Sequence, residues 1–277
     1  MSDQPSISSA AGAPPIVFDD VSMAFGARRV FDHLSFRVPA GLIAVILGGS
    51  GSGKSTALRL IGGLVQPVSG RVLVDGEDVA RLGERQLTRV RAKLGMLFQG
   101  GALLDAMTVF ENVAFPLREH ARLSAAEIAT RVRESLAAVG LPDAEALLPG
   151  QLSGGMVKRV ALARAIVMRP TILLCDEPFS GLDPISACRI EALLGGINAR
   201  FGMTIVVVSH DIASTMRMAA RVLILLPDGA VEGAPADLQR SGDARVAGFL
   251  QPDVEAALRQ EAAAVAAAPV EAAAGPW

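Results

Sequence analysis

The chain has 277 residues, which is close to the size at which one hydrophobic core stops growing, so its length favours one domain with at most a smaller lobe. Hydrophobic residues make up 51% of the chain and aromatic residues 4%, so the core is expected to consist mainly of aliphatic side chains. The formal net charge is -2 with both signs mixed, which argues against the basic surface that nucleic acids require. No nucleic acid is therefore expected as a partner.

Neither end of the chain nor its apolar runs predict a membrane span. The longest runs, residues 42–47 and 204–208, are of strand length and fall far short of the roughly 20 residues that a spanning helix needs. Residues 1–15 lack a basic segment followed by an apolar one, so they are expected to form a disordered leader and not a secretion signal. These features predict a cytoplasmic location.

Cys175 and Cys188 lack metal-ligand spacing, and both are expected to be buried thiols.

The first quarter of the chain alternates between strands and one helix. Residues 16–38 are expected to form antiparallel strands, and residues 42–47 a buried strand. An amphipathic helix is expected over residues 54–64, with Leu64 on its apolar face, followed by another strand at 70–75.

The middle of the chain is helical in character, from about residue 100 to residue 168, after a strand at 94–98. Ser124 and Glu127 form a capping-box pattern, and Gly140 is expected to end the helix that follows. Further strands are expected at 171–175 and 204–208, and further helices near 186–200 and 212–219. Alternating strands and helices predict a three-layer α/β core with a mostly parallel sheet.

One glycine-rich segment fits the phosphate-binding loop pattern: Gly48-Gly49-Ser50-Gly51-Ser52-Gly53-Lys54-Ser55-Thr56. It follows a predicted strand and leads into a predicted helix, which argues against a simple glycine-rich turn. Glycines allow successive N–H groups to face the phosphates, and the helix N-terminus adds partial positive charge. We expect Lys54 to contact the β- and γ-phosphates of a nucleotide and Ser55 to bind Mg²⁺.

Polar residues follow three apolar strands. Asp176 and Glu177 end the first of these; alone they would fit a solvated loop, but with a phosphate loop upstream Asp176 is expected in the Mg²⁺ shell. Glu177 is placed to orient or deprotonate an attacking water. Gln99 and His210 follow the other two strands, and because ligands gather at the carboxyl ends of parallel strands, both are expected to point at the same γ-phosphate. Taken singly, either could be an ordinary surface residue.

A second glycine-rich segment, Leu152-Ser153-Gly154-Gly155-Met156, precedes a predicted helix at 156–168. Ser153 alone reads as an N-cap, but that interpretation leaves the paired glycines unexplained. Paired glycines at a helix start expose N–H groups to an anion. One nucleotide needs only one glycine-rich segment to bind its phosphates. The second such segment therefore predicts a site that another chain completes.

The order and spacing of these motifs resemble ATP-binding cassette (ABC) proteins across residues 16–250. The resemblance implies a P-loop NTPase of the α/β class, an ABC nucleotide-binding domain with a RecA-like parallel-sheet core, an antiparallel β subdomain and a helical subdomain at about 100–168. The disordered leader at 1–15 and an Ala-rich extension at 251–277 would lie outside that domain. Phe25 looks like the aromatic residue that stacks on adenine in this family.

The same resemblance implies the cofactors ATP and Mg²⁺ and a head-to-tail homodimer. Ser153, Gly154 and Gly155 of one chain would close over ATP held by the other. Glu177 would be the catalytic base, with His210 and Asp183, the last residue of the D-loop, acting across the interface. Gln99 of the Q-loop would join Ser55 and Asp176 at the metal.

A finer resemblance is to the ATP-binding subunits of MCE-type phospholipid transporters, the Mla (maintenance of lipid asymmetry) system. It rests on Leu97-Phe98-Gln99-Gly100-Gly101-Ala102-Leu103-Leu104-Asp105, on residues 108–119, and on Met156, where most importer cassettes have Gln, followed by Lys158 and Arg159. It implies phospholipid transport between inner and outer membranes by a peripheral protein on the cytoplasmic face of the bacterial inner membrane. The implied partners are a permease docking near residues 102–117, an MCE-domain subunit and small accessory subunits.

Two other functions stay open at this point. One is the ATPase of an amino-acid or other small-solute importer, against which Met156 and the Q-loop segment argue. The other is a soluble cassette that clamps DNA or ribosomes. Such clamps usually carry long coiled-coil insertions or twin cassettes, and neither fits this sequence. The extension at 251–277 is expected to pack on a neighbouring subunit, because Trp277 has no evident internal partner.

Overall fold

The structure, a computed structural model, describes residues 13–251. Most of the predicted leader and nearly all of the predicted C-terminal extension, with Trp277, lie outside the described residues. The chain divides into two compact units, Met1–Pro235 and Ala236–Trp277. Within residues 13–251, no helix combines the length and the apolar character that crossing a membrane requires.

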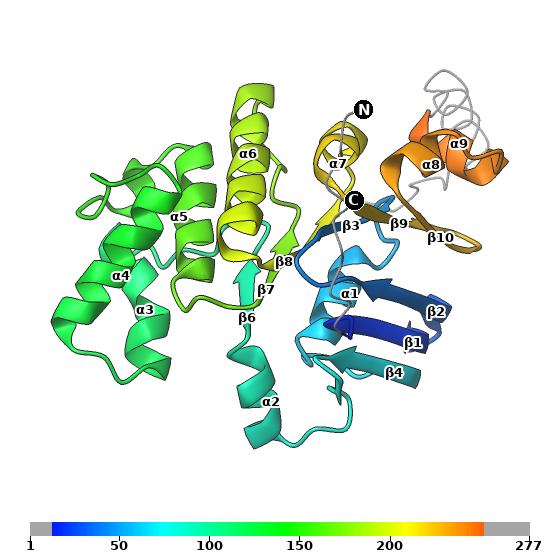
Figure 1. Cartoon of the computed structure of the whole chain (residues 1–277), viewed down its shortest axis with the longest axis horizontal. Coiled ribbons are helices and arrows are strands. Elements are labelled where there is room, and N and C mark those ends of the chain that lie inside the picture. Colours follow the sequence, from blue (N-terminus) through cyan, green and yellow to red (C-terminus); the bar gives the residue numbers. More distant parts are fainter. Residues whose placement is uncertain (1–12, 252–277) are drawn as a thin grey trace, which may run out of the picture. The chain divides into compact units, whose positions relative to one another are not determined.

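An antiparallel sheet forms the first part of the larger unit (Figure 1). Its strands are β1 (Ile16–Phe25), β2 (Arg28–Val38), β4 (Ser69–Val74) and β5 (Glu77–Asp78), in the order β2-β1-β4-β5. Alternate side chains of β1 are buried, and Phe18 stacks on Phe36 of β2 with ring centroids 4.3 Å apart. The predicted antiparallel strands are therefore present.

A second sheet of six strands carries the mostly parallel core that the alternating pattern predicted. Its strands run in the order β10-β9-β3-β8-β7-β6, and only the β9–β10 pairing among the described strands of this sheet is antiparallel. Every residue of β3 and β8 is buried, as expected for strands covered on both faces. The strands are β3 (Ile43–Gly48), β6 (Leu94–Leu97), β7 (Ile172–Asp176), β8 (Thr204–Ser209), β9 (Arg221–Leu226) and β10 (Gly229–Gly233).

Helix α1 (Lys54–Ile61) lies between the two sheets (Figure 1). Its buried residues, including Leu58 and Ile61, share one hydrophobic core with residues of both sheets. The predicted continuation to Leu64 is wrong: Gly62 caps the helix and Gly63 has a φ of +61°. Leu64 consequently lies beyond the helix with 57% of its surface exposed.

The helical part of the chain follows β6. Ser124 caps α4 with the predicted box, because its hydroxyl accepts from the N–H of Glu127 while the Glu127 carboxylate accepts from the N–H of Ser124 at 2.7 Å. Gly140 then follows the helix end with a φ of +69°, as predicted. The helices of this part are α3 (Val109–His120), α4 (Ala125–Ala138) and α5 (Gly154–Ile166).

Two further helices, α6 (Pro184–Phe201) and α7 (Ile212–Met218), alternate with the last parallel strands. Ala187 and Ile190 of α6 face the core, whereas Cys188 lies between them in sequence and is exposed. The expectation of a buried thiol is therefore wrong for Cys188 and right for Cys175, which lies in β7. Helix α2 (Glu84–Arg91) and the β9–β10 hairpin were not predicted.

The smaller unit begins within α8 (Pro235–Gln239) and includes α9 (Ala244–Leu250). Asp243 caps α9, and its carboxylate accepts from the N–H of Arg245 at 2.9 Å. Among residues 236–251 of this unit, Leu238 and Val246 are the buried apolar ones.

Candidate functional site

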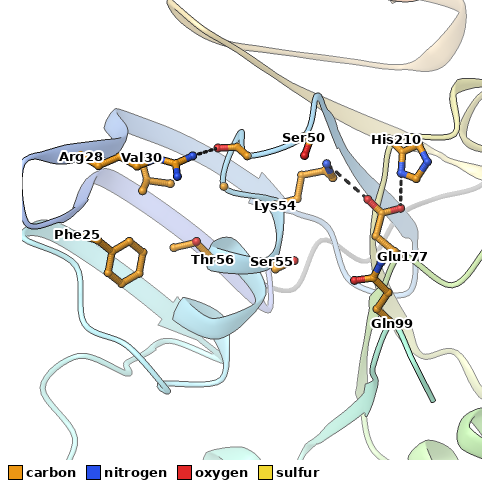
Figure 2. A pocket seen from close by; sticks show the side chains of 12 residues that line it. Phe25, Arg28, Val30, Ser50, Lys54, Ser55, Thr56, Gln99, Glu177 and His210 are labelled. Carbon is orange, nitrogen blue, oxygen red and sulfur yellow. Dashed lines mark hydrogen bonds and ion pairs between the residues drawn. The ribbon is translucent and has the colours of Figure 1, made fainter. Parts of the chain in front are cut away.

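Four loops meet at the carboxyl ends of the parallel strands. They follow β3, β6, β7 and β8, and they carry the phosphate loop, Gln99, Glu177 and His210 respectively. Ligands of open α/β sheets bind at this edge. Here it holds a cavity of about 610 Å³ (Figure 2). The residues that line the cavity are Phe25, Arg28, Val30, Ser50, Gly51, Gly53, Lys54, Ser55, Thr56, Gln99, Glu177 and His210.

The phosphate loop needs glycine at particular positions. Gly51 and Gly53 have φ angles of +76° and +99°, in the region that side chains other than glycine rarely adopt. A Cβ atom at Gly53 would lie 2.5 Å from Cγ1 of Val30, and one at Gly48 would lie 2.3 Å from Oγ of Ser52. Since Gly53 also caps α1, the loop presents the N-terminus of that helix to the cavity, as an anion site requires.

Lys54, the first residue of α1, is 8% exposed, and its side chain turns back onto the phosphate loop. Its Nζ atom donates to the main-chain oxygens of Gly48 at 2.9 Å and Gly49 at 3.0 Å. The same atom lies 3.5 Å from Oε1 of Glu177. The ammonium group is thus placed between the loop and the carboxylate that follows β7 (Figure 2).

The predicted magnesium ligands have suitable chemistry. Ser55 Oγ donates to Asp176 Oδ1 at 3.0 Å, and Gln99 lines the same cavity. Burial raises the pKa of the Asp176 carboxyl, and the hydrogen bond from Ser55 acts against that shift. Among residues 13–251 no group of three or more His, Cys, Asp and Glu could hold a metal alone. This small set of protein oxygens fits Mg²⁺, which usually binds through one or two carboxylates, waters and substrate phosphates.

Glu177 occupies a constrained position at the cavity. Its φ angle is +46°, and its N–H donates to the main-chain oxygen of Val208 at 2.9 Å. The side chain is 10% exposed, and Oε2 lies 2.8 Å from Nδ1 of His210. Both carboxylate oxygens therefore have a partner, Lys54 on one side and His210 on the other (Figure 2).

The other predicted residues lie at two helix starts. Ser153 caps α5, where its hydroxyl accepts from the N–H of Met156 at 3.3 Å, and Gly154 and Gly155 form the first turn. Asp183 caps α6 and accepts from the N–H groups of Ile185 and Ser186. Hydrogen bonds from Ser186 hold the pKa of Asp183 below its usual range. These two helix starts are separate from the residues that line the cavity, so their predicted roles require a second chain.

Sequence reasoning missed two residues of the cavity lining, Arg28 and Val30. Arg28 donates from its guanidinium to the main-chain oxygen of Gly51 at 3.1 Å. Both residues lie at the start of β2, just after the predicted adenine-stacking Phe25, which is 48% exposed. Their proximity to Phe25 in the sequence was the available signal.

Known proteins are similar to this chain over most of its length. The chain is 46% identical over 232 residues to the intermembrane phospholipid transport system ATP-binding protein MlaF of Escherichia coli K12, which covers 83% of this chain and 86% of that protein. It is 43% identical over 197 residues to the probable ribonucleotide transport ATP-binding protein mkl of Mycobacterium bovis, covering 71% of this chain and 55% of that protein.

A solved structure shares the fold. It is the dimeric post-hydrolysis state of the ATP-binding cassette MJ0796 bound to ADP and Pi, with a TM-score of 0.72 and 33% identity over 79% of this chain and 98% of that chain. The family model for ABC transporters matches residues 31–180. The chain therefore belongs to the ABC transporter family, as an ATP-hydrolysing subunit.

Proposed function

We propose that this chain powers the transport of phospholipids between the inner and outer membranes of a bacterium. The observation that supports this most is the 46% identity, over 83% of the chain, to a protein named for intermembrane phospholipid transport. Met156 in the signature segment and the residues after Gln99 agree with that assignment. The protein would then be peripheral on the cytoplasmic face of the inner membrane, with MCE-domain and small accessory subunits as further partners.

Hydrolysis would take place in the cavity at the sheet edge. Lys54 and the N–H groups of the loop would bind the β- and γ-phosphates, and Phe25 would stack on adenine. Ser55, Asp176 and Gln99 would hold Mg²⁺, which would supply positive charge against the negative charge of the phosphates.

Glu177 is our proposed base. Its carboxylate lies beside Lys54, where the γ-phosphate would bind, so it can accept a proton from a water at that phosphate. His210 holds the second carboxylate oxygen and so restricts how the side chain turns. Both side chains come from adjacent strand ends, which are rigid supports for a hydrolytic site.

The site would be complete only in a homodimer. Ser153, Gly154 and Gly155 begin α5, and the first N–H groups of a helix have no partner within the helix. A partner's γ-phosphate is the anion that suits them. Asp183 would act across the same interface. The dimeric cassette of similar fold supports this arrangement.

A second cavity, of about 720 Å³, is our proposed docking groove for the permease. It lies beside α3 and α5, and it overlaps the predicted docking segment 102–117. Three of its apolar side chains, Phe98, Leu104 and Phe115, are at least 40% exposed. An amphipathic segment of a membrane subunit would bury these side chains.

The docking proposal can be tested with one substitution and a matched control. Phe115→Glu should abolish co-purification with the membrane subunits, whereas Phe201→Glu, on a side chain of similar exposure at the end of α6, should not. Equal co-purification of both variants would place the permease elsewhere.

The transport function is tested by isolating the complex from native membranes and reconstituting it in vesicles. We expect phospholipid to co-purify with the complex and labelled phospholipid to move between vesicles when ATP is supplied, with no movement for the Glu177→Gln complex. The relative named for ribonucleotide transport favours a small-solute importer as the alternative. ATP-driven uptake of ribonucleotides or amino acids without phospholipid movement would support that alternative and exclude ours.

A further inference from the structure

Helix α5 carries a buried lysine, Lys158, that lies outside the proposed ATP site. Lys158 is 5% exposed, and it lies five residues after Ser153, or about 7.5 Å along the helix axis. Lysine is almost never so deeply buried unless its charge has partners. Burial lowers the pKa of the Lys158 ammonium, and the nearby carboxylates of Asp176 and Glu177 act against that shift.

The hydrogen-bond acceptors of Lys158 are main-chain carbonyls of the catalytic machinery. Its Nζ atom donates to the oxygen of Gln99 and, at 3.3 Å, to the oxygen of Glu177. One ammonium group thus joins the first residue of the Q-loop to the residue proposed as the base. Hydrogen bonds from a charged donor stabilise more than those from a neutral one.

The main chain of Glu177 needs such support. A residue other than glycine with a φ of +46° is in a sparsely populated region, which persists where neighbouring groups hold it. The N–H of Glu177 donates to Val208, and its carbonyl accepts from the N–H of Ser180 at 3.2 Å and from Lys158. Lys158 supplies the side-chain bond of these three, and it comes from a different element, α5.

The same helix also holds the segment that follows Gln99. Arg164 donates to the carbonyls of Gly101 and Ala102, each at 2.7 Å. Ala102 also has a positive φ, of +50°. Lys158 and Arg164 of α5 therefore hold the backbone at Gln99, Gly101 and Ala102. The N-terminus of the same helix carries the glycines of the signature segment.

We infer that Lys158 is a positioning residue for ATP hydrolysis, which sets the main chain of Glu177 and Gln99 against the signature helix of the same chain. The inference rests on the proposed role of Glu177 and goes beyond it. Helix α5 would then have two roles: its N-terminus would close over the partner's ATP, and its Lys158 would support the base of its own chain.

The first experiment separates turnover from ATP binding. Lys158→Met removes the donor and keeps an unbranched side chain that is one atom shorter. Because Lys158 lies outside the cavity lining, ATP affinity should stay within about threefold of wild type. We expect kcat to fall about ten- to a hundredfold, as for a misplaced catalytic group. Lys158→Arg, which keeps a charged donor, should restore most of the activity. A kcat unchanged by Lys158→Met, or a loss confined to KM, would overturn the inference.

Arg159→Met is the matched control. Arg159 is the next residue of α5 and also donates to carbonyls, those of Val139 and Gly140, which lie at the end of α4 and away from the cavity. This variant should keep the wild-type kcat. A loss equal to that of Lys158→Met would mean that any cation removed from α5 lowers turnover, and that Lys158 has no particular role.

The decisive experiment uses two differently tagged copies of the full chain, isolated together with their membrane subunits. In one complex, Lys158→Met is on the copy with an intact Glu177, and the other copy carries Glu177→Gln. In the second complex, one copy carries both substitutions and the other is wild type. The inference predicts that the first complex loses activity and that the second matches a complex with Glu177→Gln alone.

Each other outcome has a definite meaning. A folding defect caused by Lys158→Met would affect both mixed complexes, so equal losses, or no loss in either, would contradict the inference. If a complex with Glu177→Gln on both copies still hydrolyses ATP, the proposed role of Glu177 is what fails.

Discussion

The Nδ1 atom of His210 lies 2.8 Å from Oε2 of Glu177, while Oε1 of the same carboxylate lies 3.5 Å from Nζ of Lys54. A carboxylate that is 10% exposed is costly to bury unless both oxygens find partners. Here the two partners come from the phosphate loop and from the end of β8. The carboxylate is consequently held beside the point where the γ-phosphate of bound ATP is expected.

Glu177→Gln should keep ATP binding and stop turnover. The amide fills the same space but is a far weaker base, and general-base catalysis contributes typically about 10²- to 10⁴-fold. Phosphate release should fall by at least about a hundredfold. ATP should trap a dimer visible by size-exclusion chromatography. Glu191→Gln is the control, because the Glu191 side chain is also 10% exposed but pairs with Arg217 on α7. Normal hydrolysis by Glu177→Gln would remove Glu177 from the base role.

Lys54→Met should weaken nucleotide binding. Charge-assisted hydrogen bonds are worth about 1.5–3 kcal/mol each, so losing one contact to a phosphate should raise Kd about 10- to 150-fold. Isothermal titration with ATP measures the change. Lys93→Met is the control. It removes an ion pair with Asp75, neither residue lines the cavity, and Kd should not change. An unchanged Kd for Lys54→Met would show that the ammonium does not contact the phosphates.

Gly53→Ala should prevent nucleotide binding for a steric reason. The added methyl group would lie 2.5 Å from Cγ1 of Val30, at a φ of +99°. The loop must therefore change shape, and binding measured by titration should be lost. Gly196→Ala is the control, because a Cβ at Gly196 meets open space in the middle of α6. It should leave binding intact and raise the free energy of unfolding by about 0.5–1 kcal/mol, and ATP binding by both variants would show that the loop tolerates the methyl group.

The sequence predicted the motif-bearing elements well because their chemistry is local. A phosphate loop needs a strand, glycines and a helix in succession, and residues 43–61 provide all three within one short stretch. Asp176 and Glu177 come directly after a run of apolar residues, so the strand end and the polar pair are visible together. The capping box at Ser124 and Glu127 is equally local and is present as predicted.

Features set by distant parts of the chain escaped prediction. The exposure of Cys188 depends on which face of α6 meets the sheet. The burial of Lys158 depends on carbonyls 59 and 19 residues away in the sequence. The β9–β10 hairpin did have a local signal, an apolar run ending in Pro227-Asp228-Gly229, which sequence reasoning overlooked.

Asn112→Ala should destabilise the segment before α3. The buried Asn112 side chain accepts from the N–H of Leu104 at 2.7 Å and donates to the carbonyls of Leu104, Met107 and Thr108. Leaving buried groups without partners costs about 1–3 kcal/mol, so the free energy of unfolding in urea should fall by at least that amount. Gln66→Ala, which removes one exposed bond of 3.3 Å to Ala80, should cost less than about 0.5 kcal/mol. Equal effects of the two variants would contradict this account of the loop.

The capping box at the start of α3 should make part of the stability depend on pH. The N–H and hydroxyl of Thr108 donate to the Glu111 carboxylate, and they hold the pKa of Glu111 below its usual value of 4.5. Because the pKa is lower in the folded state, this contribution is fully present above the unfolded-state pKa and is lost as the pH falls through the folded-state value. We expect wild type to lose more unfolding free energy than Glu111→Gln between about pH 7 and about pH 3.5, since Gln does not titrate.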